Sequence, residues 1–148
     1  MSVSLIGRSE LFNTMETKRF RIPLFVERVS AGFPSPAQDY VEQTLDLNDL
    51  CIKRPSATFF VRVDGDSMID AGIHPDDILV VDRSIQAKHG DVVIAGIYGE
   101  LTVKELHLIP RIKLFPRNQA YAPIEIPEDI ELDIFGVVTS VVRNIHRK

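Results

Sequence analysis

From residue 57 onwards, runs of β-branched and aromatic residues alternate with short polar segments. The runs span residues 57–63, 78–82, 91–98, 100–106, 111–115 and 132–142. Gly, Pro, Asp or Asn bounds each run, a pattern that is typical of β-strands. No helical pattern alternates with these runs, so a doubly wound parallel sheet is not expected. We therefore predict a mostly β fold whose body is a curled antiparallel sheet or a small barrel.

The junction between two of these runs, "YGE" at residues 98–100, is short enough to predict a tight β-hairpin. A hairpin joins antiparallel strands, which agrees with the predicted sheet.

A segment typical of a linker occurs at residues 30–36, "SAGFPSP", which combines small residues with two prolines. Each proline favours extended geometry in the residue before it, so this segment should cross the surface as an open strand or linker. We place a boundary here, between an extended N-terminal arm of residues 1–31 and a body of residues 32–148. Thus the prediction is one folded body preceded by an arm.

Two short helices are predicted at the start of the body. Ser35 is a candidate N-cap with Pro36 at the first helical position and Gln38 three residues after the cap, which predicts a helix running toward Leu45. The segment "DLNDLCI", residues 46–52, predicts a second helical turn.

Length and composition limit the class of protein to which the chain can belong. A chain of 148 residues with 45% apolar residues is long enough for one domain with a real core. Cys51 is the sole cysteine, so an intrachain disulfide and a zinc site of paired thiolates are both excluded. The uncharged run at 134–142 is far too short for a membrane helix, and residues 1–17 lack the features of a secretion signal. We expect a cytoplasmic protein without a membrane segment.

Charge is unevenly distributed along the chain. The arm has five Lys or Arg residues against three Glu, a net charge of +2, and the remainder has 12 against 18, a net charge of −6. An acidic body repels phosphate, so direct sequence-specific DNA binding is not expected. The arm is either an ordinary solvated tail or a contact for an acidic partner.

Two residues carry candidate chemistry. Ser67 stands between Asp66 and Met68 in a turn after a strand. A hydroxyl held there, beside exposed backbone N–H groups, becomes a nucleophile if a base removes its proton. Lys104 shares a predicted strand face with Leu106, and burial of that face would lower its pKa and make it a base. Alternatively, Ser67 caps a turn and Lys104 protects a sheet edge.

Other site types find little support. The carboxylates Asp64, Asp66 and Asp70 resemble the start of a calcium loop, but Met68 and Ile69 stand where that loop requires Asp or Asn and Gly. Neither of the glycine-rich phosphate-binding motifs occurs. We therefore expect no metal and no cofactor.

Several motifs together resemble the LexA/UmuD-type family of self-cleaving serine-lysine peptidases, and its UmuD branch most of all. They are "FPSPAQDYVEQTLDLNDL", "GDSMIDAGIHPDDILVVD", "HGDVVIAG", "ELTVKEL" and "DIFGVVTSVV", in the family's order. The resemblance implies that Ser67 is the nucleophile and Lys104 its base. It also implies cleavage between Ala31 and Gly32, with the oxyanion held by backbone N–H groups near Asp66 and Ser67.

The same resemblance implies a role in the SOS response to DNA damage. A RecA filament on single-stranded DNA would promote cleavage, and the trimmed body would form a homodimer that serves a UmuC-type polymerase catalytic subunit in translesion synthesis. Two alternatives stay open: a β-rich binding module without activity, and a fragment of a LexA-like repressor. The second would need a DNA-reading domain, for which 31 residues are too few. Cleavage within one chain or between two chains is equally compatible with the sequence.

Overall fold

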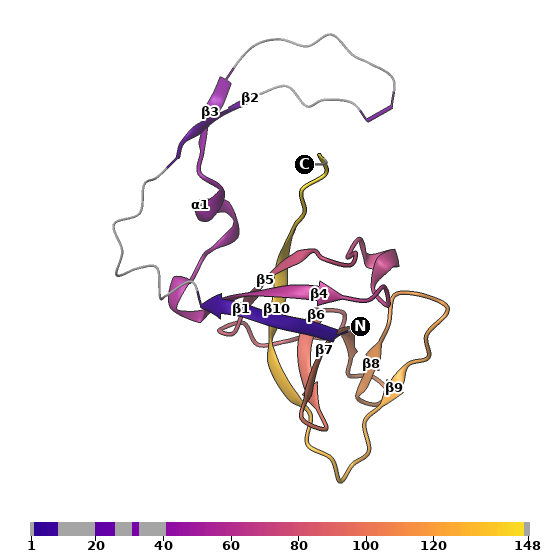
Figure 1. Ribbon diagram of the computed structural model, residues 1–148. Helices are drawn as coiled ribbons and strands as arrows, with labels where there is room; N and C mark the ends of the chain where they lie inside the picture. The colour runs from indigo at the N-terminus through magenta and orange to yellow at the C-terminus, as the bar shows by residue number, and fades with distance from the viewer. Residues whose placement is uncertain (1, 9–19, 26–30, 33–40, 147–148) are drawn as a thin grey trace.

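The computed structural model of the chain describes residues 2–8, 20–25, 31–32 and 41–146. Figure 1 shows a strongly curled sheet from which a small hairpin and a short helix project. The strands are β1 (Ser2–Arg8), β2 (Ile22–Phe25), β3 (Val41–Leu45), β4 (Thr58–Asp64), β5 (Ile78–Asp82), β6 (Val92–Ile97), β7 (Glu100–His107), β8 (Lys113–Phe115), β9 (Ile124–Glu125) and β10 (Asp133–Val142). The helical segments are α1 (Leu47–Cys51) and two 3-10 turns, η2 (Pro55–Ala57) and η3 (Ile69–Ala71).

The main sheet is antiparallel and nearly closes on itself. Its strand order is β1-β4-β5-β10-β6-β7-β8-β9, and β1 also pairs with β7 through Ser2 and Thr102. This extra pairing brings two distant strands of the sheet together, as in a small barrel. The predicted mostly β, curled antiparallel fold is therefore confirmed. A separate two-stranded sheet consists of β2 and β3.

Two apolar clusters hold the curled sheet. The first lies between β4, β5, β6 and β7 and continues into the segment after β4. The second packs on the part of the sheet formed by β6, β7, β8 and β10. Their buried members are Phe59, Val61, Val63, Met68, Ile73, Leu79, Val81, Ile94 and Val103 in the first, and Val93, Ala95, Leu106, Leu114 and Val137 in the second. Both faces of β7 thus meet buried side chains.

The predicted hairpin joins β6 to β7. Ile97 pairs with Glu100, and Tyr98 and Gly99 between them both have positive φ, 51° and 79°. Two consecutive residues with positive φ match the right-handed twist of the flanking strands, which is the usual geometry of a two-residue hairpin. The hairpin prediction is confirmed.

The helix predicted at residues 46–52 is confirmed, and the helix predicted from Ser35 toward Leu45 is wrong over residues 41–45. Helix α1 lies within the predicted segment 46–52, and Asp46 caps it by accepting a hydrogen bond of 2.8 Å from the N–H of Asn48. Residues 41–45 form β3 rather than the end of a helix, because they pair with β2 of the arm. Residues 35–40 lie outside the described residues. No helix in the described ranges is long and apolar enough to cross a membrane.

The predicted strands are confirmed with small changes at their ends. The runs at 57–63, 78–82, 91–98, 100–106, 111–115 and 132–142 correspond to β4, β5, β6, β7, β8 and β10. The sequence pattern missed β1, β2 and β9, of which the last is only two residues long.

Candidate active site

Ser67 lies in the turn that follows β4. Gly65, with a φ of 93°, lets the backbone leave the strand in a direction that other residues rarely adopt. Met68 is fully buried in the first apolar cluster and fixes the turn to the core. The N–H of Val63 donates to the Asp77 carbonyl over 2.9 Å, which ties the end of this segment back to β4. The Ser67 side chain is consequently fully buried and held on a rigid support.

Lys104 approaches this turn from β7. Its side chain is only 4% exposed, and on the neighbouring strand it pairs with Val93, which is fully buried. Strand alternation predicted that Lys104 shares a face with Leu106, and the structure buries both side chains. The alternative role of an exposed lysine that protects a sheet edge does not fit this burial.

The two side chains meet. Lys104 Nζ lies 3.1 Å from Ser67 Oγ, 3.0 Å from Thr102 Oγ1 and 3.1 Å from the Val103 carbonyl oxygen. These three partners are neutral, and no ion pair to Lys104 occurs among the described residues. Burial therefore lowers the pKa of Lys104, because desolvation disfavours the charged ammonium. The arrangement gives one hydroxyl and one amine that loses its proton unusually easily.

Thr102 is a member of this group that the sequence did not identify as a site residue, although strand alternation puts it on the face of Lys104. It stands two residues before Lys104 on the same strand, so side-chain alternation places both on one face of β7. Its hydroxyl gives Lys104 Nζ a second neutral acceptor. The period of two was thus a usable signal for Thr102.

The backbone N–H groups of Asp66 and Ser67, expected to bind the oxyanion, lie in the same turn. Within the part of the chain that the structure describes, neither group donates a hydrogen bond. Free N–H groups beside a nucleophile are the donors that a tetrahedral intermediate requires. Their role remains a prediction.

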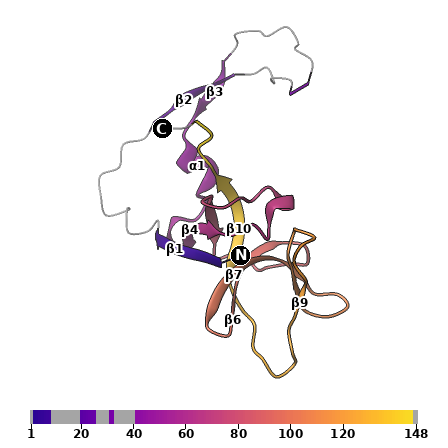
Figure 2. The same cartoon turned by 45° about the vertical axis from the view of Figure 1, so that its right-hand side comes forward.

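The expected cleavage junction is not at the Ser67 turn. Ala31 and Gly32 are both exposed and belong to the connection between β2 and β3. Figures 1 and 2 show this short segment beyond the hairpin, well away from β4 and β7. The structure therefore brings Ser67 and Lys104 together but leaves the junction apart from them.

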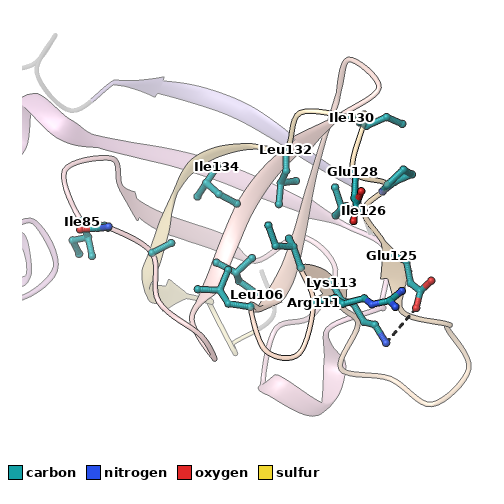
Figure 3. A pocket seen from close by; sticks show the side chains of 15 residues that line it. Ile85, Leu106, Arg111, Lys113, Glu125, Ile126, Glu128, Ile130, Leu132 and Ile134 are labelled. Carbon is teal, nitrogen blue, oxygen red and sulfur yellow. Dashed lines mark ion pairs between the residues drawn. The ribbon is translucent and has the colours of Figure 1, made fainter.

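A cavity of about 1090 Å³ lies elsewhere on the sheet, between β7, β8 and the segment before β10. Figure 3 shows isoleucine and leucine side chains on its floor and the ion pair between Lys113 and Glu125, 3.3 Å apart, at its rim. Neither Ser67 nor Lys104 lines this cavity. In the described ranges no group of three or more His, Cys, Asp or Glu side chains is arranged to hold a metal ion.

Comparisons with known proteins identify the family of the chain. Residues 23–139 match the family described as Peptidase S24-like. The chain is 58% identical to the protein SamA of Salmonella typhimurium over 120 residues, which cover 81% of this chain and 84% of SamA. It is 51% identical to the protein MucA of Escherichia coli over 119 residues, 80% of this chain and 82% of MucA.

A more distant relative is the LexA repressor of Alcanivorax borkumensis, with 40% identity over 121 residues that cover 80% of this chain and 58% of the repressor. The resemblance to the LexA/UmuD-type family is thereby confirmed. On the match to the family model and the extent of these similarities, the chain belongs to the Peptidase S24-like family.

Proposed function

We propose that this protein is a self-cleaving serine peptidase that cuts its own chain between Ala31 and Gly32, with Ser67 as nucleophile and Lys104 as general base. The observation that carries the proposal is the 3.1 Å separation of Lys104 Nζ and Ser67 Oγ, two buried groups, with no carboxylate paired to the amine among the residues that the structure describes. A lysine placed in this way loses its proton more readily than an exposed lysine, because burial lowers its pKa, and a general base must be deprotonated to act.

In the first half of the reaction, Ser67 Oγ attacks the carbonyl carbon of Ala31 while its proton passes to Lys104 Nζ. The backbone N–H groups of Asp66 and Ser67 stabilise the negative charge on the carbonyl oxygen. The C–N bond to Gly32 then breaks, and the protonated Lys104 gives its proton to the departing amine. An ester between Ser67 and Ala31 remains.

In the second half, water attacks the ester carbonyl and gives a proton to Lys104, which is neutral again after the first half. The C–O bond to Ser67 breaks, and its oxygen recovers the proton from Lys104. Thr102 supports this cycle because its hydroxyl accepts a hydrogen bond from the Lys104 amine and keeps Nζ oriented toward Ser67.

Delivery of the junction controls the reaction, since a tethered substrate has a high effective concentration once it reaches the site. The junction would dock as an extended strand beside the site. The edge of β4 is one that accepts an added strand, because β1 already pairs with it, from Ser2 opposite Asp64 to Arg8 opposite Phe59. The segment around Ala31 must leave its place beyond the β2–β3 hairpin to reach this region.

The biological setting follows the family resemblance. A RecA filament on single-stranded DNA would favour the docked state after DNA damage, and the trimmed body, residues 32–148, would form a homodimer. That dimer would serve as accessory subunit of a UmuC-type catalytic subunit during translesion synthesis. The extensive similarity to MucA and the match to the LexA repressor support this part of the proposal.

The test is to incubate the full chain with RecA, single-stranded DNA and a nucleoside triphosphate, and to measure the product masses. The expected result is a fragment that begins at Gly32. Ser67→Ala and Lys104→Met should remain uncut, the latter because methionine fills the space of the lysine stem without an amine.

Matched controls are available on the surface. Ser56→Ala and Lys88→Ala change the same residue types at exposed positions, so both should be cut at the wild-type rate. A fragment that begins elsewhere would refute the assigned junction. Continued cleavage of either site variant would remove that residue from the mechanism.

A further inference from the structure

The loop of residues 116–121, which follows β8, is fastened to the turn that carries Ser67. The N–H of Arg117 donates to the Ser67 carbonyl over 2.8 Å, and the Arg117 carbonyl accepts from the N–H of Asp70 over 2.8 Å. These two backbone bonds lie on either side of Met68, which anchors the same turn in the core. The loop and the turn are therefore held in a fixed register.

Side chains of the loop add contacts directly before the nucleophile. Asn118 Nδ2 donates to the Asp66 carbonyl over 3.0 Å, and the hydroxyl of Tyr121 donates to Asp66 Oδ1 over 2.6 Å. Asn118 Oδ1 accepts from the N–H of Ala120 over 3.0 Å, which shapes the loop itself. Both the backbone and the side chain of Asp66 are thus fixed by this one loop.

The loop also reaches the strand of the base. Arg117 Nη1 lies 2.6 Å from Glu105 Oε2, and Glu105 follows Lys104 on β7. The other oxygen of Glu105 is 2.7 Å from His107 Nε2. One loop consequently connects the turn of the nucleophile with the strand of the amine.

We propose that Asn118 and Tyr121 are positioning residues for the Ser67 nucleophile, holding Asp66 so that the Ser67 hydroxyl and the adjacent backbone N–H groups keep the geometry required for attack. The proposal rests on the proposed function of Ser67. Among the hydrogen bonds of the described residues, neither side chain bonds to Ser67 Oγ or Lys104 Nζ, so their effect passes through Asp66.

The physical reason is the sensitivity of the reaction to small displacements. A misplacement of about 1 Å at a reacting group can lower a rate by about 100-fold. Asp66 immediately precedes Ser67, so rotation of the Asp66 peptide would turn the Ser67 N–H and displace Oγ together. Hydrogen bonds to the carbonyl and the carboxylate of Asp66 oppose that rotation from two directions.

Two variants each remove one hydrogen bond to Asp66 while keeping the shape of the loop. Tyr121→Phe removes one hydroxyl and keeps the ring. Asn118→Asp keeps the oxygen that accepts from the Ala120 N–H but loses the donor to the Asp66 carbonyl. Tyr98→Phe, at the exposed β6–β7 turn, and Asn144→Asp, at an exposed position after β10, are the matched controls.

The first measurement is spontaneous self-cleavage of the full chain at alkaline pH without RecA. Hydrogen bonding to Asp66 raises the pKa of the Tyr121 hydroxyl, whereas burial lowers the pKa of Lys104. Each site variant should cleave about tenfold more slowly, which is the typical effect of losing one hydrogen bond. Both controls should match the wild type, and circular dichroism at the assay temperature should show every chain folded.

The second measurement is the rate at which a fluorophosphonate labels Ser67, which does not require the junction to dock. In this reaction the Oγ–P bond forms, fluoride leaves and the Oγ proton passes to Lys104. Labelling of Tyr121→Phe and Asn118→Asp should fall by the same factor as their self-cleavage. Wild-type labelling rates in both folded variants would overturn the positioning role.

The two proposals fail in different ways. A wild-type chain that is labelled at Ser67 but never cleaves would refute self-cleavage, and the labelling rates of the variants would still decide the role of Asn118 and Tyr121. A wild-type chain that cleaves, with variants that cleave equally fast, would refute the positioning role alone.

Discussion

The pH dependence of spontaneous self-cleavage is the sharpest consequence of the buried Lys104. With RecA omitted, the rate should follow the fraction of Lys104 that is neutral. Below the pKa of the amine, that fraction grows about tenfold for each unit of pH, so the logarithm of the rate should rise with a slope of about one. A slope of one corresponds to the loss of a single proton from Lys104 Nζ, whose hydrogen-bond partners among the described residues are two hydroxyls and a backbone carbonyl.

The pH at which the cleavage rate stops rising reports the pKa of Lys104. An exposed lysine has a pKa of about 10.4, and the rate would then rise throughout the range below it. Burial lowers the pKa of Lys104, so the rate should level off at a pH below that value. The lowered pKa of Lys104 also makes stability depend on pH. Between its pKa in the folded chain and its higher pKa in the unfolded chain, the folded chain binds fewer protons, so the free energy of unfolding rises with pH in that window.

The assay follows the loss of full-length chain by gel electrophoresis in buffers between about pH 7 and pH 11, a range chosen to bracket the ordinary lysine pKa. Lys104→Met should show no cleavage at any pH, and Lys88→Ala should reproduce the wild-type curve. A wild-type rate that is independent of pH, or one that levels off only at the pKa of an ordinary exposed lysine, would refute the reasoning from burial.

Three further predictions concern the sheet edge and stability. Removing residues 2–8 frees the edge of β4 and should speed spontaneous cleavage several-fold; an unchanged or lower rate in a folded chain would argue against competition at this edge. Arg143→Ala should lower the free energy of unfolding by about 2 kcal/mol in urea titrations, because the buried Asp77 carboxylate loses both bonds from Arg143, 2.6 and 2.7 Å long. Burial alone would raise the pKa of Asp77, but its hydrogen bonds to Arg143 and His74 outweigh burial, and the pKa is lowered overall. The free energy of unfolding of the wild type should therefore fall as pH drops through this lowered pKa, and that of the variant should fall less. Gly136→Ala should cost about 1–3 kcal/mol, measured by thermal unfolding, because the new Cβ would lie 2.6 Å from Val81 Cγ1.

The strands of the body could be predicted from local pattern because their side chains face two different environments. Alternation along β7 was enough to place Lys104 on the same face as Leu106 and Thr102, and the tertiary structure then buried Lys104. The turn after β4 was recognisable from its Gly and Asp residues, and the β6–β7 hairpin from "YGE". These features depend on residues that are neighbours in the sequence.

Other features depend on partners that lie far along the chain. Residues 41–45 form a strand because β2 supplies hydrogen-bond partners for them, and that pairing overrode the local helix signal before it. The pairing of β1 with both β4 and β7 likewise has no local signature. Long-range pairing of this kind is decided by the tertiary fold.

The sequence by itself determined which residue types are available for chemistry and which face of a strand they occupy. Only the tertiary structure decided that Lys104 Nζ lies 3.1 Å from Ser67 Oγ, since 37 positions separate the two residues. It also decided that Tyr121 and Asn118 hold Asp66, across distances of 55 and 52 positions. The physical reason is that burial and hydrogen bonding, which set the pKa of the amine and the orientation of the hydroxyl, are properties of the surroundings that only the folded chain creates.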